Sequence, residues 1–124
     1  ETLAGIRHAR ELLRTTDLRS RIARYHGDRT DEVITRWIET WLSPEFLVWS
    51  IEHFLAGITV PVLVLQGVRD EFGSAVQVEA IANGVSGVSE SRLVAGAAHN
   101  PHKEATDETL RTTVDFLRRN GLIA

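Results

Sequence analysis

The chain has 124 residues, about the length of one domain, and its 43% hydrophobic and 25% charged residues are ordinary for a globular protein. A net charge of -3 implies no polyanionic partner, and the absence of cysteine excludes disulfides, thiolate catalysis and cysteine-ligated zinc. The longest apolar run, near VPVLVL, is too short to cross a membrane, and no basic-then-apolar leader opens the chain. We therefore expect a cytoplasmic protein without a membrane or nucleic-acid partner.

The first part of the chain, residues 1 to about 57, is predicted to be helical because apolar residues recur there at helical spacing. Two helices are expected over residues 3–13 and 18–26, the second ending near His26-Gly27. The apolar residues that indicate them are Leu3, Ile6, Leu13, Leu18, Ile22 and Tyr25. Six arginines crowd the same segment but are interrupted by acidic residues, so we expect a solvated helix face rather than a nucleic-acid arm. They are Arg7, Arg10, Arg14, Arg19, Arg21 and Arg24.

A third helix has the clearest pattern. Its apolar stripe consists of Ile34, Trp37, Ile38 and Trp41. Thr30 is predicted to cap this helix, with acidic residues in its first turn, where the helix dipole favours them. Ser43 then predicts a new N-cap, with Pro44 at the first helical position. Gly57 is expected to end the helical half.

The hydrophobic period then changes. VPVLVLQG (residues 60–67) predicts a strand buried on both faces and hence parallel, with Pro61 tolerated only at its first position. Ser74 and Gln77 predict a capping box, and Asn83-Gly84 predicts the C-terminal stop of the helix that follows. The apolar stripe of that helix consists of Val78, Ile81, Ala82 and Val85.

RLVA (residues 92–95) predicts a second short strand, and a last helix is expected from Thr106 to Asn120-Gly121. Its inward residues are predicted to be Leu110, Val114 and Leu117. Strands that alternate with helices imply a right-handed parallel βαβ unit. The sequence therefore predicts an α/β fold in which a helical segment precedes a parallel βαβα unit.

Two residues that could do chemistry follow the predicted strands. Asp70 comes three residues after Gly67, and His99 comes just past the second strand. Sites in open α/β sheets form at the carboxyl ends of strands, and neighbouring strands lie about 4.8 Å apart. A carboxylate on one loop can then reach an imidazole on the next. This arrangement suits an Asp that orients a His acting as general base, and the small residues 96–98 would let the turn bend sharply.

Other interpretations of these residues remain open. A loop His is often a polar surface residue, an Asp after a strand is often a helix cap, and the neighbouring Glu71 could serve as the acid instead. A metal site built from His99, His102 and Glu104 is disfavoured, because Pro101 interrupts the spacing and no zinc pattern matches. We therefore predict no metal.

The sequence resembles the C-terminal part of an α/β-hydrolase-fold enzyme. PVLVLQGVRDEFG matches the strand that ends in Gly-x-x-Asp, with Asp70 as the acid of a catalytic triad. AHNPH matches the Gly-His-Ser-Pro-His-like segment that carries the catalytic His, here His99. Ala98 and Asn100 replace the usual Gly and Ser, and neither change removes chemistry. WLSPEFLVWSIEHFLAGITVP is similar to the cap-to-core segment of esterase-like and carbon–carbon-bond hydrolase-like members.

The resemblance implies that residues 1–57 are a helical cap segment and residues 58–124 the C-terminal part of the hydrolase core. It implies a Ser-His-Asp type triad that acts on an ester, amide, epoxide or carbon–carbon bond of a small-molecule substrate and needs no cofactor. The nucleophile motif Gly-x-Ser-x-Gly is absent, and Ser86 in GVSGVS lacks its pattern and follows a helix. Since the chain begins at Glu1 without any Met, we expect a fragment that is inactive alone and lacks its nucleophile.

The aromatic residues of the helical half allow two interpretations. Trp37, Trp41 and Trp49, together with two phenylalanines, could line an apolar substrate pocket beneath the cap, or they could pack the cap helices together.

A different class of function also remains open, namely a non-enzymatic interaction or dimerisation module with a relic Asp-His pair. The exposed edge of its sheet would then be covered by the N-terminal half of the same fold or by a second copy.

Overall fold

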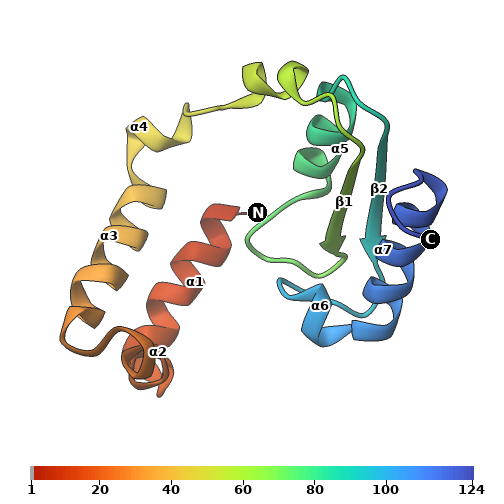
Figure 1. Ribbon diagram of the computed structural model, residues 1–124. Helices are drawn as coiled ribbons and strands as arrows, with labels where there is room; N and C mark the ends of the chain where they lie inside the picture. Colours follow the sequence, from red (N-terminus) through yellow and green to blue (C-terminus); the bar gives the residue numbers. More distant parts are fainter. Residues whose placement is uncertain (1) are drawn as a thin grey trace. The chain divides into compact units, whose positions relative to one another are not determined.

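The computed structural model describes residues 2–124, which divide into two compact units, Glu1–Trp49 and Ser50–Ala124 (Figure 1). The first unit is helical. Its elements are α1 (Thr2–Thr15), α2 (Leu18–His26), the 3-10 turn η1 (Gly27–Arg29), α3 (Thr30–Leu42) and α4 (Pro44–Leu47). The second unit is mixed. Its elements are the 3-10 helix η2 (Glu52–Gly57), β1 (Val62–Gly67), α5 (Ala75–Gly84), β2 (Ser89–Val94), α6 (Pro101–Glu104) and α7 (Thr106–Arg119). The structure is thus mixed α/β, as expected.

In the first unit, α1 and α2 both pack against α3. Ile6, Ala9 and Ile38 supply its buried apolar side chains, and Ile6 and Ile38 belong to the stripes expected for α1 and α3. Tyr25 was expected on the apolar stripe of α2, but it is 87% exposed. The stripe of α2 is therefore shorter than its sequence spacing predicted, and the six arginines lie exposed on α1 and α2, as expected for a solvated face.

The N-terminus of α3 differs from the prediction. Thr30 is the first residue of the helix and not its cap, because η1 leads directly into α3 with helical backbone angles. Its hydroxyl donates to the carbonyl oxygen of Gly27 at 2.6 Å, and the residue is only 2% exposed. Ser43 does cap α4, since its hydroxyl oxygen accepts from the backbone N–H of Phe46 at 3.2 Å, and Pro44 takes the first position.

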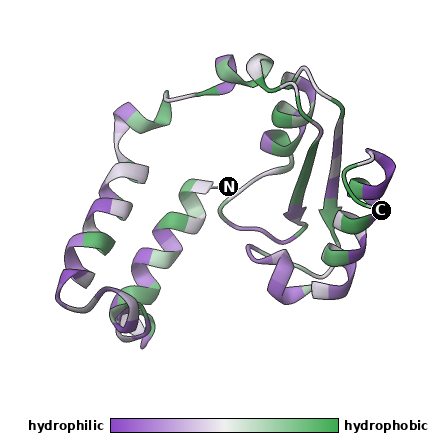
Figure 2. Ribbon diagram, in the orientation of Figure 1, coloured by the Kyte–Doolittle hydropathy of each residue, from purple (hydrophilic) through white to green (hydrophobic). Residues whose placement is uncertain are grey.

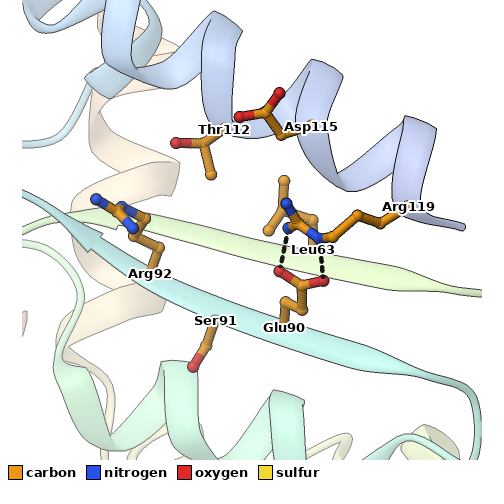
Figure 3. Close-up of a pocket in the computed structure, with 7 residues that line it drawn as sticks. All are labelled: Leu63, Glu90, Ser91, Arg92, Thr112, Asp115 and Arg119. Atoms are coloured by element: carbon orange, nitrogen blue, oxygen red, sulfur yellow. Dashed lines mark hydrogen bonds and ion pairs between the residues drawn. The ribbon is translucent and has the colours of Figure 1, made fainter.

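The two strands of the second unit are parallel, in a register that pairs Val62 with Ser89 at one end and Gly67 with Val94 at the other. This confirms the predicted parallel pair. The Ser89 hydroxyl donates to the Ala82 carbonyl of α5 at 2.6 Å, so α5 lies on that face of the sheet. Helix α7 covers the opposite face, toward which Leu63 points (Figure 3).

The strands are less buried than predicted. Within residues 2–124 the sheet has two strands, so β1 has one neighbour, and only its last residue, Gly67, is buried. Strand β2 begins at Ser89, three residues before the predicted start at Arg92, because its polar first half still pairs with β1. The strands also differ in hydropathy, β1 being apolar over most of its length and β2 mixed (Figure 2).

The boundary between the units falls at residues 49/50, before the predicted boundary at 57/58. The reason is that η2 packs on α5. Gly84 faces Leu55 of η2, and a Cβ at residue 84 would lie 2.6 Å from the Leu55 Cδ1. Helix α5 ends at Gly84, as predicted, and the absence of a side chain at this residue leaves room for Leu55.

Helices α5 and α7 begin as predicted, and the Ser74 amide donates to Gln77 Oε1 at 2.8 Å in the capping box of α5. The inward face of α7 was predicted wrongly in part. Leu110 is 61% exposed, and Phe116 is the buried residue, at 3%. Thr109 can face inward because its hydroxyl donates to the Pro101 carbonyl at 3.0 Å. Helix α7 ends at Arg119, and Gly121 follows with a φ of 65°, so the stop predicted at Asn120-Gly121 is confirmed. None of the helices within residues 2–124 combines the length and apolar character that a membrane crossing requires.

Candidate functional site

The candidate site lies where both strands end. Gly67 and Val94 are the last register pair, and the Val68 N–H still donates to the Val94 carbonyl at 3.1 Å. The segments that follow the two strands therefore begin side by side at the same edge of the sheet. Asp70 follows in the turn after β1, and His99 follows in the turn after β2, as the sequence predicted.

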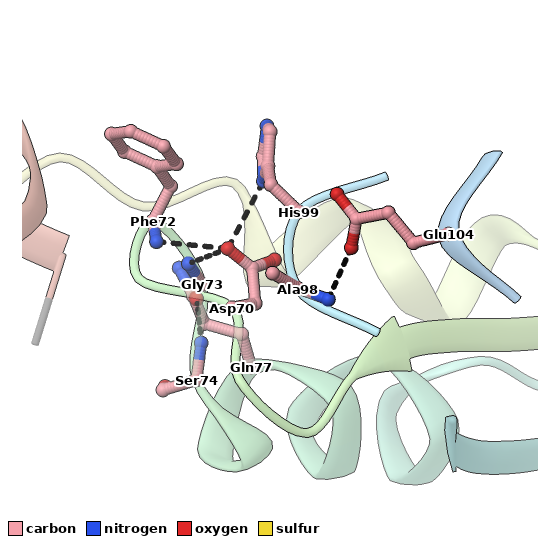
Figure 4. A network of polar contacts seen from close by, with 8 residues as sticks. All are labelled: Asp70, Phe72, Gly73, Ser74, Gln77, Ala98, His99 and Glu104. Carbon is pink, nitrogen blue, oxygen red and sulfur yellow. Dashed lines mark hydrogen bonds and ion pairs between the residues drawn. The ribbon is translucent and has the colours of Figure 1, made fainter. Parts of the chain in front are cut away.

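The two side chains meet. Nδ1 of His99 lies 3.0 Å from Oδ1 of Asp70 (Figure 4). The Asp70 side chain is 8% exposed and that of His99 is 56% exposed. The same Asp70 oxygen accepts from the backbone N–H groups of Phe72 at 2.8 Å and Gly73 at 3.2 Å. These donors hold the carboxylate in place, and the predicted contact between Asp70 and His99 is confirmed.

The contact sets which nitrogen of His99 carries a proton. An ionised carboxylate only accepts hydrogen bonds, so Nδ1 must be the donor and the neutral ring keeps a lone pair on Nε2. Figure 4 shows the far end of the ring directed away from Asp70. The ring of Phe72 meets the imidazole edge-on, with centroids 4.9 Å apart. The arrangement presents a basic nitrogen outward on a ring that an anion orients, which is the geometry of a general base.

The other candidates for acid or ligand are placed differently. Glu71 is exposed, and Asp70 makes the contact with His99. The carboxylate of Glu104 accepts from the Ala98 N–H, while His102 is exposed on α6. Among residues 2–124, no group of three or more His, Cys, Asp or Glu side chains could hold a metal ion.

The structure keeps Ser86 away from His99. Ser86 follows α5, and its hydroxyl donates to the Ala56 carbonyl at 2.8 Å, in the loop expected for it. It precedes β2, whereas His99 follows β2, and six residues of strand span about 20 Å. In the described residues, His99 hydrogen-bonds Asp70 and no hydroxyl side chain.

The three tryptophans lie in the first unit. Trp41 meets Phe46 edge-on with centroids 4.8 Å apart, and Phe46 stacks on Trp49 at 5.0 Å. Packing between α3 and α4 therefore accounts for Trp41. Trp37 and Trp49 are both exposed, and a substrate-binding role for the three tryptophans stays a prediction.

A small hollow of about 140 Å³ lies between α7 and the sheet, and neither Asp70 nor His99 is among the residues that line it (Figure 3). Glu90 and Arg119 close one side of it through two hydrogen bonds of 2.6 and 3.4 Å. Arg92, on the other side, pairs with Glu108 at 3.4 Å. Glu90, Arg92 and Arg119 are thus paired within the unit.

Two residues that support the site were not predicted for this role. Glu104 was considered only as a metal ligand, and Arg69 was not considered. Arg69 directly precedes Asp70, and Glu104 follows His99 by five residues, across the start of α6. This closeness in sequence to Asp70 and His99 is the signal that could have indicated their supporting role.

Comparison with known proteins gave no match to any family model, curated protein or solved structure.

Proposed function

We propose that this chain is the C-terminal part of an α/β-hydrolase-fold enzyme, in which His99 is the general base and Asp70 orients it. The observation that carries the proposal is the 3.0 Å contact between Asp70 Oδ1 and His99 Nδ1, with the other ring nitrogen outward. The resemblance of the segments around both residues to that fold supports it.

In the proposed reaction, a serine hydroxyl supplied by sequence outside these residues approaches Nε2 of His99. His99 takes the hydroxyl proton as the oxygen attacks an ester, amide or comparable carbonyl, and Asp70 stabilises the imidazolium that forms. The ring then returns the proton to the leaving group. Carbon–carbon bonds and epoxides are further substrate classes for the same pair of residues. The proposed reaction uses no cofactor.

Two variants of the full encoded protein test the proposal. His99→Ala removes the base, and His102→Ala removes an exposed imidazole three residues away. We expect a p-nitrophenyl ester panel, together with labelling by a fluorophosphonate probe, to show activity in the full protein. Loss of one triad member lowers kcat by about 10³-fold or more, so His99→Ala should lose this activity and His102→Ala should keep it.

Three outcomes would contradict the proposal. If the His99→Ala variant of the full protein kept its activity, the role of His99 as general base would be refuted. A His99-dependent rate in the 124-residue chain alone would refute a nucleophile outside it. A gene without a Gly-x-Ser-x-Gly motif upstream of Glu1 would leave the reaction without its serine.

An interaction module is a second candidate, supported by the two-stranded sheet. Within residues 2–124 each strand has one neighbour, and unpaired strand edges attract further strands. The partner would be the N-terminal half of the same fold or a second copy. A gene that encodes only this chain, with a stable dimer in analytical ultracentrifugation, would favour this candidate.

A further inference from the structure

We propose that Glu104 and Arg69 are positioning residues that fix the backbone on which His99 is presented. The inference rests on the proposed function, because it concerns how His99 is held for that role. The hydrogen bond described for the imidazole is the one with Asp70. Glu104 and Arg69 bind the turn of residues 96–98 instead, Glu104 from α6 and Arg69 from the end of β1.

Glu104 holds the turn from α6. Its carboxylate accepts from the backbone N–H of Ala98, directly before His99 (Figure 4). Directly after His99, the Asn100 carbonyl accepts from the N–H groups of Lys103 at 2.8 Å and Glu104 at 3.0 Å. The backbone of His99 is therefore tied to the same short helix on both sides.

Arg69 holds the turn from the end of β1. Its backbone N–H donates to the Ala97 carbonyl at 3.0 Å, and its guanidinium donates to the Gly96 carbonyl. Because Arg69 is the residue before Asp70, the segment that carries the acid also binds the turn that carries the base. A shift of one would move the other.

These ties are needed because packing does not hold the imidazole. The His99 side chain is 56% exposed, and its described contacts are Asp70 and the edge of Phe72. An exposed ring keeps a productive geometry, within about 0.5 Å, only if its supporting residues are fixed. Hydrogen bonds to charged groups are the stronger kind, and Glu104 and Arg69 each contribute one to the turn.

The test uses the 124-residue chain with 15N-labelled histidine rings and compares Glu104→Ala with Glu104→Gln. The alanine variant removes the acceptor of the Ala98 N–H, whereas glutamine keeps an acceptor oxygen. We expect hydrogen exchange of the Ala98 amide to be about 10- to 100-fold faster in Glu104→Ala and close to the parent in Glu104→Gln. The Nδ1 signal of His99 should move in Glu104→Ala toward its position in Asp70→Asn, while the signals of His8 and His26, on α1 and α2, serve as internal references.

The outcomes separate this inference from the proposed function. If Asp70→Asn leaves the His99 ring signals unchanged, the Asp-His pair and the proposed function fail. If Asp70→Asn moves them and Glu104→Ala does not, Glu104 supports α6 alone and the positioning role is overturned. Equal behaviour of Glu104→Ala and Glu104→Gln would overturn it as well.

Arg69→Ala provides a second variant should Glu104→Ala melt α6. It removes the Gly96 contact from the β1 side and leaves the helix intact. The His99 Nδ1 signal should move in this variant too, and an unchanged signal contradicts the proposal.

Discussion

Replacement of Gly67 by alanine probes how closely the His99-bearing turn lies against the end of β1. A Cβ at residue 67 would lie 2.0 Å from the carbonyl oxygen of Ala98 and 2.5 Å from the carbonyl carbon of Ala97. Favourable contacts between such atoms occur at about 3.5–4.0 Å, so the turn would have to retreat by more than about 1 Å. No side-chain rotamer can relieve the overlap, because the atoms that would clash belong to the backbone.

The cost follows from what the retreat disturbs. Overpacking costs about 1–3 kcal/mol, and each weakened hydrogen bond, such as Arg69 N–H to the Ala97 carbonyl, adds about 0.5–1.5 kcal/mol. We expect Gly67→Ala to lower the free energy of unfolding of the second unit by about 2–5 kcal/mol, a large share of a typical 5–15 kcal/mol. The Asp70–His99 contact should lengthen at the same time.

Gly57→Ala is the matched control. A Cβ at residue 57 meets no atom within 4 Å, so this variant should stay within about 0.5 kcal/mol of the parent. All three tryptophans lie in the first unit, so urea unfolding is best followed by circular dichroism and amide hydrogen exchange rather than by tryptophan fluorescence. A Gly67→Ala chain as stable as Gly57→Ala, with unmoved His99 ring signals, would refute the reasoning.

Two further predictions concern other parts of the molecule. Phe116→Ala should lower the free energy of unfolding in urea titrations by about 3–5 kcal/mol, because the ring is buried. Leu110→Ala should lower it by less than about 1 kcal/mol, because Leu110 is exposed. Equal losses in the two variants would contradict the inward face assigned to α7. The hydrogen bond from Arg19 lowers the pKa of Asp31, so the pair stabilises the fold fully above the unfolded pKa of about 3.9, and this contribution is lost as pH falls through the lower folded pKa. A carboxyl 13C titration should show the lower midpoint of Asp31 returning toward its ordinary value in Arg19→Gln, and an unchanged midpoint would exclude this cause.

Local signals in the sequence predicted much of the fold and the central contact. The capping box at Ser74 and the N-cap at Ser43 involve residues three apart, so their partners are visible in the sequence. The Asp70–His99 contact was predictable because parallel strands end together, and each residue directly follows a strand.

The errors arose where a distant partner decides the outcome. Leu110 was assigned inward as part of an apolar stripe with Val114 and Leu117, but Phe116 is the buried residue of α7. The half-buried Thr109 and Thr113 are accommodated because their hydroxyls donate to backbone carbonyls. Gly84 was correctly predicted to end α5, but its close approach to Leu55, almost thirty residues away, was not visible in the sequence. The roles of Glu104 and Arg69 depend on the path of the turn after β2, which apolar periodicity does not describe.

The contacts that form the candidate site all come from one uninterrupted stretch of chain. Strand β1 begins at Val62 and α6 ends at Glu104, and Asp70 and His99 lie 29 residues apart, with α5 and β2 between them. Such a segment can be inherited or exchanged as one continuous piece of the gene. Recombination at residues 49/50 would exchange the helical unit and leave every described contact of the pair in place. Selection could therefore remodel the first unit freely while Asp70, His99 and the residues that hold them are inherited as a block.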